Sequence, residues 1–194
     1  FDLLGAPLKE WIAQTLEQLG VQNSPVIHGT VHPQAIVEGS VYVAKGATIG
    51  PFAYVQGPCI IGPNAEVRHT AFIRGNVYVG QKAVVGHSTE GKGSIFLDDA
   101  KAGHFAYVGD SILGRNCNLG AGTKLANLKL DNSNVRYRDP DTQDSKDSGL
   151  RKFGAIIGEH SQIGCNAVLS PGSLLQPRSM VMPCEHYHNS KKRI

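Results

Sequence analysis

A large aliphatic side chain recurs at every sixth position through much of the chain. The first series consists of ten consecutive β-branched residues: Val31, Val37, Val43, Ile49, Val55, Ile61, Val67, Ile73, Val79 and Val85. Small side chains mostly occur four residues after these positions, and glycine often follows the aliphatic residue directly. A period of six matches neither the 3.6-residue period of a helix nor the two-residue alternation of one long strand. It therefore indicates an internal structural repeat.

This repeat predicts a solenoid of short parallel strands joined by tight turns. The large aliphatic side chain is expected to point inward, the small residue to fill a corner, and glycine to accommodate the turn. One five-residue step follows Gly91 and another leads to Leu113, and the six-residue period resumes after an interruption at Ile157. Cys59 and Cys117 fall on small corner positions, so we expect both to be buried core residues.

Two segments depart from the repeat. Residues 7–19 have a helical face, and Gly20 can end the helix; that face consists of Leu8, Trp11, Ile12, Leu16 and Leu19. Such a helix can cap the first coil and bury its open edge. Residues 128–150 are polar and rich in turn-forming residues, which predicts a loop ejected from the solenoid at about residues 128–151. The chain is thus expected to have an N-terminal helical arm at residues 1–23 and an all-β domain at residues 24–194, ending in a solvated tail from residue 186.

Charge and composition restrict the possible partners. The net charge of +3 is too small to predict nucleic-acid binding, although clustered cations would suit a small anionic substrate. Apolar runs are only a few residues long, and the first residues lack the regions of a secretory signal, so neither a membrane span nor secretion is predicted. The four cysteines contain no CxxC pair, which favours free thiols in a cytoplasmic protein.

Three motifs resemble a known enzyme family: "KAGHFAYVGD" at residues 101–110, "NLGAGTKLAN" at 118–127 and "KFGAIIG" at 152–158. With the repeat over roughly residues 26–183, the chain resembles left-handed β-helix acyltransferases. Residues 71–127 and 152–165 resemble, more narrowly, the acetyltransferase domain of bifunctional N-acetylglucosamine-1-phosphate uridyltransferase/glucosamine-1-phosphate acetyltransferases. The resemblance implies a left-handed parallel β-helix with three hexapeptides per triangular coil. It also implies acetyl-coenzyme A as acetyl donor, glucosamine-1-phosphate as acceptor, a role in UDP-N-acetylglucosamine biosynthesis, and a homotrimer with sites between subunits.

The same resemblance implies roles for individual residues. His104 matches the catalytic base of the family, and Glu90 matches the carboxylate that orients it. The matches to sugar-phosphate ligands are Arg74, Lys92, Tyr107 and Lys152. Asn118 and Asn127 match polar contacts to the sugar. Ala121 matches a backbone contact to the acetyl group, Cys165 stands where a serine near the coenzyme is usual, and no metal is expected at the site.

The coil geometry predicts which of these residues are neighbours. Residues one coil apart should stack at about the inter-strand spacing, ~4.8 Å. Arg74 and Lys92 should therefore share an outer edge, where a phosphate between them would offset their mutual repulsion. By the same register Glu90 should stack with Tyr107, and His104 should lie over the backbone at Ala121.

These positions suit acyl transfer to an amine. Attack on a thioester requires the free amine, and histidine is well matched to removing the proton near neutral pH. Glu90 could fix the tautomer of His104, and N–H groups of the "GAG" turn at residues 120–122 could bond the thioester oxygen as charge develops.

Three alternatives remain open. Another acyltransferase of this fold could acylate a nucleotide sugar with coenzyme A or acyl carrier protein as donor. A γ-class carbonic anhydrase shares the coil but needs three histidine ligands for zinc, and His69, His87 and His104 do not repeat its spacing. The third alternative is a non-catalytic assembly scaffold.

Overall fold

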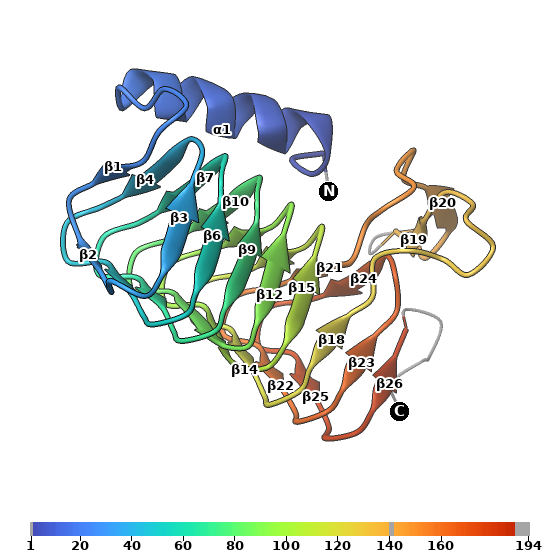
Figure 1. Cartoon of the computed structure of the whole chain (residues 1–194). Helices are drawn as coiled ribbons and strands as arrows, with labels where there is room; N and C mark the ends of the chain where they lie inside the picture. Colours follow the sequence, from blue (N-terminus) through green and yellow to red (C-terminus); the bar gives the residue numbers. More distant parts are fainter. Residues whose placement is uncertain (1, 140–141, 189–194) are drawn as a thin grey trace.

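The chain forms a left-handed β-helix of triangular cross-section, with one helix packed along its side (Figure 1). The computed structural model describes residues 2–139 and 142–188. Three parallel sheets of eight strands each form the sides, here called faces A, B and C. Face A contains β1 (Val26–Ile27), β4 (Val41–Val43), β7 (Cys59–Ile61), β10 (Val77–Val79), β13 (Ile95–Phe96), β16 (Ile112–Leu113), β21 (Ala155–Ile157) and β24 (Ser173–Leu175). Face B contains β2 (Thr30–Val31), β5 (Thr48–Ile49), β8 (Glu66–Val67), β11 (Val84–His87), β14 (Lys101–His104), β17 (Asn118–Leu119), β22 (Gln162–Ile163) and β25 (Met180–Val181). Face C contains β3 (Ile36–Glu38), β6 (Tyr54–Gln56), β9 (Phe72–Arg74), β12 (Glu90–Lys92), β15 (Tyr107–Gly109), β18 (Lys124–Leu125), β23 (Val168–Leu169) and β26 (His186–Tyr187).

The strand register confirms the predicted coil of three hexapeptides. Tyr42 pairs with Ile60, which is 18 residues later. Ile60 pairs with Tyr78 at the same advance, and only then does the advance shorten to 17 residues, as Tyr78 pairs with Ile95. This shortening is the five-residue step seen in the sequence. Ile112 pairs with Ile156 across the ejected segment, so the solenoid continues without a break on the far side of that insertion.

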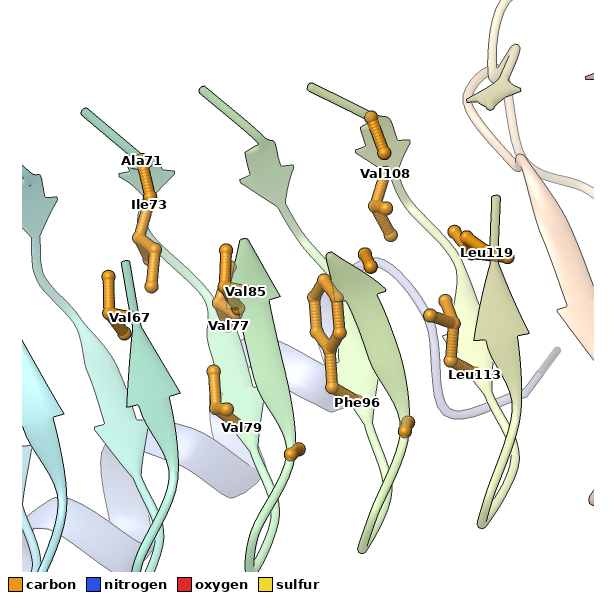
Figure 2. Packing of buried hydrophobic residues seen from close by; sticks show 14 of the residues in the cluster. Val67, Ala71, Ile73, Val77, Val79, Val85, Phe96, Val108, Leu113 and Leu119 are labelled. Atoms are coloured by element: carbon orange, nitrogen blue, oxygen red, sulfur yellow. The ribbon is translucent and has the colours of Figure 1, made fainter. Parts of the chain in front are cut away.

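The predicted inward positions form the core of the solenoid. Residues such as Ile73, Val79, Val85 and Leu119 are at most 1 % exposed and stack in rows along the axis (Figure 2). At the first five-residue step an aliphatic side chain is replaced by Gly91. A Cβ at Gly91 would lie 3.5 Å from the ring of Phe96, which occupies the space that the missing side chain leaves.

The corners require left-handed backbone conformations, and polar residues supply many of them. At the corner between faces B and C, Thr70 and Ser88 have φ values of 57° and 52°. Gly122 occupies the same corner with φ 71°, and a Cβ there would meet the Asn166 side chain and lie 2.9 Å from the Phe105 ring. Glycine is therefore required at the centre of the "GAG" turn for both conformation and space.

The N-terminal helix α1 (Ala6–Gln18) lies along face A and does not cap the first coil. Leu8, Ile12 and Leu16 are buried against residues of that face, including Ile60 and Ile95. Trp11 and Leu19, which the sequence places on the same helical face, are 44 % and 39 % exposed. The expected cap is wrong because face A carries outward apolar side chains at successive coils, which give a helix more apolar surface than one exposed edge does. Gly20 ends the helix as expected, with φ 73°.

The ejected segment is more ordered than a loop. It contains an antiparallel hairpin of β19 (Arg136–Arg138) and β20 (Ser145–Asp147), and a bridge between Leu128 and Lys152 closes its base. Val135 and Phe153 are fully buried in the cluster that also holds α1. The segment is therefore attached to the solenoid beside the N-terminal end of α1.

The C-terminal region corrects another expectation. His186 and Tyr187 form β26 and pair with Val168 and Leu169, so the last coil extends into the stretch predicted to be a solvated tail. The rest of that stretch, from residue 189, lies outside the described residues. Within the described part of the chain, no helix has the length and apolarity needed to cross a membrane.

Candidate active site

Face C carries the candidate residues that the register was expected to stack. Glu90 pairs with Phe72 on one side and with Tyr107 on the other, and Gly91 pairs with Ile73. Lys92, the next residue of its strand, therefore follows Arg74 one coil later at the corner between faces C and A. Both stacking predictions for this face are confirmed.

A groove of about 490 Å³ opens at that corner, and cations dominate its lining. Its lining includes five basic side chains and one carboxylate: Lys9, Arg74, Lys92, Arg151, Lys152 and Asp110. Lys152 was predicted to belong to a phosphate site, and the hairpin segment brings it to the groove beside Arg74 and Lys92. Lys9 comes from α1 and Arg151 from the end of the ejected segment. The sequence could not indicate either residue, because both lie outside the repeat.

Asp110 organises the interior of this groove and was also missed from the sequence. It accepts hydrogen bonds from the Lys92 ammonium at 2.7 and 3.0 Å and from the Asn127 amide at 2.5 Å. The pair is partly buried, with side-chain exposures of 23 % for Lys92 and 13 % for Asp110. The signal available in the sequence was its place at the end of "KAGHFAYVGD", directly after Gly109, which pairs with Lys92 one coil earlier. Asp110 thus fixes one cation and one polar sugar-contact candidate in a single arrangement.

Arg74, Glu90 and Tyr107 form a second group on the same face. The Arg74 guanidinium donates to the Glu90 carboxylate at 2.6 Å, and this pairing raises the pKa of Arg74. Burial raises the pKa of the Tyr107 phenol, with Glu90 and Asp110 adding to the effect. Tyr107 is therefore a neutral hydroxyl at physiological pH and can donate a hydrogen bond to an anion.

His104 lies at the other end of face C, at the corner with face B, and its partner there is another histidine. Its Nδ1 lies 3.0 Å from Nε2 of His87, the residue with which it pairs between β11 and β14. Among the described residues, no hydrogen bond joins His104 to Glu90, whose carboxylate is bonded to Arg74. The structure therefore does not bring Glu90 into the orienting position that the resemblance implies.

The coenzyme-side candidates follow His104 along the same corner. Ala102 pairs with Leu119, and Leu119 pairs with Ile163, so the positions of His104, Ala121 and Cys165 occupy successive coils. The Gly122 N–H donates to the His104 carbonyl oxygen at 3.1 Å, which confirms that His104 lies over the "GAG" turn. The N–H groups of Gly120 and Gly122 are both used within the solenoid. Across residues 2–139 and 142–188, the Ala121 N–H donates to no backbone acceptor, so it is the amide of this turn that a ligand can use.

The candidates surround three separate grooves in one chain. His104 and Asn118 line a groove of about 410 Å³ on face B. Glu90, Tyr107 and Asn127 line one of about 520 Å³ on face C, and Arg74, Lys92 and Lys152 line the cationic groove at the next corner. A single chain therefore presents the base and the cations at two different corners, which lie at opposite ends of face C.

The cysteines match the sequence interpretation. All four are free thiols, with Cys59 and Cys117 buried and Cys165 and Cys184 exposed. Burial raises the pKa of Cys59 to about 12, which makes its thiol unreactive near neutral pH. The exposed thiol of Cys165 lies at the corner that carries His104 and Ala121.

Comparisons with known proteins agree with the motifs. Residues 55–142 match the family model of the GMPPB C-terminal domain. The chain is 38 % identical over 85 residues to the bifunctional protein GlmU of Methanococcus aeolicus, a match that covers 44 % of this chain and 20 % of that protein. It is 37 % identical over 87 residues to a bifunctional sugar-1-phosphate nucleotidylyltransferase/acetyltransferase of Sulfurisphaera tokodaii, covering 45 % and 21 %. The matches thus span about a fifth of the length of these curated relatives.

Among solved structures, the acetyltransferase domain of PglB from Neisseria gonorrhoeae, in complex with acetyl coenzyme A, aligns with a TM-score of 0.33 and 14 % identity. That alignment covers 91 % of this chain and 62 % of the domain. In its repeat, its solenoid and its sequence similarity to the GlmU proteins, the chain resembles the hexapeptide-repeat acyltransferases.

Proposed function

We propose that this protein transfers an acetyl group from acetyl-coenzyme A to the amine of an amino-sugar phosphate, with glucosamine-1-phosphate as the acceptor. The product would enter UDP-N-acetylglucosamine synthesis. The proposal draws on the names of the similar proteins, which are bifunctional GlmU and sugar-1-phosphate nucleotidylyltransferase/acetyltransferase. Its structural support is independent of those names and comes from the charged and polar side chains that line the grooves.

The convergence of cations on one groove carries the proposal. Lys9, Arg151 and Lys152 join Arg74 and Lys92 there, and only one carboxylate, Asp110, is in the lining. Such a cluster attracts a dianion such as a phosphate monoester, which arginine can bond through two oxygens. Tyr107 and Asn127 lie on the same face, where they can contact the hydroxyl groups of an attached sugar.

The corner between faces B and C supplies the groups that acetyl transfer requires. His104 is exposed there and can accept the proton that the amine loses on attack. The Ala121 N–H lies in the neighbouring coil and can donate to the thioester oxygen as negative charge develops. In this proposal Cys165, one coil further, lies beside the bound coenzyme.

The separation of the grooves supports a site shared between copies of the chain. Four residues lie between Lys92 and His87, the coil-neighbour of His104, so the backbone contour from one to the other is up to ~17 Å. A small sugar phosphate held by the cations of one chain would be more easily reached by the His104 corner of another. We therefore propose a homotrimer with intersubunit sites, located in the cytoplasm, where its free thiols would persist.

The decisive experiment is an acceptor panel with acetyl-coenzyme A, read by release of the coenzyme thiol. Glucosamine-1-phosphate should be the preferred acceptor, and glucosamine and glucosamine-6-phosphate should be poor ones. Thiol release that is equal with and without a sugar phosphate, at all acceptor concentrations, would refute the proposed reaction.

The groove has more cations than one phosphate monoester needs, and this favours a second candidate acceptor, an amino sugar carried on a nucleoside diphosphate. Arg74 and Lys92 already have carboxylate partners, so Lys9, Arg151 and Lys152 supply further positive charge that a diphosphate could use. A nucleoside-diphosphate amino sugar belongs in the same panel. A higher kcat/KM for it than for glucosamine-1-phosphate would favour this candidate.

A further inference from the structure

His87, which pairs with His104 at the corner between faces B and C, has no part in the roles described so far. His87 Nε2 and His104 Nδ1 are 3.0 Å apart, within hydrogen-bond distance, and the two rings meet edge to face with centroids 5.1 Å apart. Such a bond requires one ring to donate and the other to accept. The direction of donation therefore decides which nitrogen of His104 is free to act as a base.

Only one direction is compatible with catalysis through the outer nitrogen. If His104 Nδ1–H donates to His87 Nε2, then His104 Nε2 keeps its lone pair and can take a proton. If His87 donates instead, His104 Nε2 carries the proton and is not a base. Glu90 does not make this choice in the structure, because its carboxylate is bonded to Arg74 at 2.6 Å and the ring nitrogen of His87 is the partner of His104.

We propose that His87 is a positioning residue, which accepts the Nδ1–H of His104 and so holds His104 in the tautomer with a free Nε2. The inference rests on the proposed acetyl transfer and assigns to His87 the orienting role that the family resemblance implies for Glu90. His87 touches His104 and not the reacting atoms, so its effect is exerted through the base.

The surroundings of His87 restrict its own ring. The His69 ring stacks on it with a centroid distance of 5.2 Å and an interplanar angle of 5°, and the Phe105 ring lies 5.9 Å away on a tilted plane. The Phe105 N–H also donates to the His87 carbonyl oxygen at 2.7 Å, which ties the two coils together beside the pair. These two ring contacts limit the rotamers through which the half-buried His87 imidazole presents Nε2 to His104.

The proton balance of the reaction is consistent with this arrangement. The amine nitrogen forms a bond to the thioester carbonyl carbon, and its proton moves to His104 Nε2. The C–S bond then breaks, and the departing thiolate takes that proton back from Nε2. The hydrogen bond from His104 Nδ1–H to His87 stays in place throughout. It stabilises the transient imidazolium of His104, as an acceptor bonded to Nδ1–H does for other catalytic histidines.

Other charged side chains lie near the histidine pair, and the variants used to test the proposal should leave them unchanged. The face B groove that His104 lines also contains Glu66, Arg68, Lys82, Asp99 and Lys101. Glu90 lies on the adjoining strand of face C. None of these side chains hydrogen-bonds His104 within residues 2–139 and 142–188. A substitution of His87 therefore removes the side-chain partner of His104 and leaves the Arg68–Glu66 and Arg74–Glu90 ion pairs in place.

The first test reads the tautomer directly and needs no substrate. Histidine ring nitrogens are labelled with 15N, the His104 resonances are assigned by comparison with His104→Ala, and two-bond couplings show which nitrogen carries the proton. The neutral ring of His104 should be protonated at Nδ1 in the unaltered protein. A neutral His104 protonated mainly at Nε2 would overturn the proposal, whether or not the protein transfers acetyl groups.

The second test compares matched substitutions. His87→Phe keeps an aromatic ring against His69 but removes the acceptor, so kcat should fall about 10- to 100-fold with KM little changed, as expected for a less effective general base. His87→Gln keeps an acceptor at a similar reach and should retain kcat within about threefold of the original protein. His69→Phe is the control, since it changes a neighbouring ring that does not touch His104.

The outcomes separate the two proposals. Equal kcat values for His87→Phe and the original protein would overturn the positioning role while leaving acetyl transfer intact. If the protein transfers no acetyl group but His104 still changes tautomer on His87→Phe, the proposed function is refuted and the positioning contact is supported.

Discussion

Arg74 and Lys92 are each bonded to a carboxylate, yet they differ in how firmly that carboxylate holds them. The Arg74–Glu90 pair is 44 % and 32 % exposed, whereas the Lys92–Asp110 pair is 23 % and 13 % exposed and also engages Asn127. Exposed ion pairs contribute little to stability because water and salt screen them. Arg74 can therefore exchange Glu90 for a substrate phosphate at small cost, while Lys92 is a fixed charge.

The base is tested by His104→Ala. Acetyl transfer to glucosamine-1-phosphate should slow by about 100-fold or more, the usual contribution of a positioned general base. The affinity for the acceptor should change little, because its phosphate is bound by other residues. Steady-state kcat and acceptor KM measure the two effects, and near-normal turnover would remove His104 from the mechanism.

The phosphate contact is tested by Arg74→Ala with two acceptors. The affinity for glucosamine-1-phosphate should fall about ten- to a hundred-fold, since a hydrogen bond to a charged group contributes roughly 1.5–3 kcal/mol. Plain glucosamine offers no phosphate, so its much weaker use should be nearly unaffected. Arg115→Ala is the control, because Arg115 is exposed and lines neither the cationic groove nor the groove beside His104. Equal losses with both acceptors would make Arg74 a structural residue.

The helix and the ejected hairpin are the elements that convert a regular solenoid into a candidate binding site. Leu8, Ile12 and Leu16 pack α1 on face A, and this packing places Lys9 at the rim of the groove. Val135 and Phe153 fix the base of the hairpin segment in the same apolar cluster, and Arg151 and Lys152 at the end of that segment join the groove lining. Both elements thus contribute cations where the repeat supplies only Arg74 and Lys92.

The contribution of α1 is tested by Lys9→Ala. The affinity for glucosamine-1-phosphate should fall about two- to fivefold, as expected for one exposed ionic contact. Because Lys9 is exposed and lies outside the buried face of α1, the melting temperature should stay unchanged. Lys45→Ala, an exposed lysine outside the groove, should have no effect on the affinity. An identical response of the two variants would show that α1 does not take part in phosphate binding.

The sequence could predict whatever the repeat determines. The inward row from Val43 to Val85, the pairing of Glu90 with Tyr107 and the position of His104 over the "GAG" turn all follow from a fixed register. The location of α1 did not follow, because its apolar face could cover either the open end or face A, and only the packed structure decides between them. The partners of Glu90 and His104 were likewise open, since register places backbones side by side and leaves the rotamers of long side chains undetermined.

At the scale of the whole molecule, the triangular edges are what a second copy of the chain would meet. The corner that carries His104 also carries two exposed aromatic side chains, Phe105 at 50 % and Phe52 at 61 %. Successive corner hydrogen bonds from the Thr70, Ser88 and Phe105 N–H groups place these residues along one edge. Phe52 and Phe105 thus expose apolar surface at the two ends of a stretch of this edge, with Thr70 and Ser88 between them, and a second copy of the chain could cover that surface.

The proposed homotrimer predicts the mass of the protein in solution. Sedimentation at micromolar concentration should give a mass near three times 20.7 kDa. Phe52→Glu places a charge on the edge three coils away from His104, so it should shift the protein toward monomers and reduce acetyl transfer without altering the catalytic corner itself. Leu130→Glu changes an equally apolar and fully exposed residue of the ejected segment, and it should leave the mass unchanged. A monomeric protein that is fully active would contradict the shared site, because His104 and the cationic groove of one chain would then have to act together across a whole face of the solenoid.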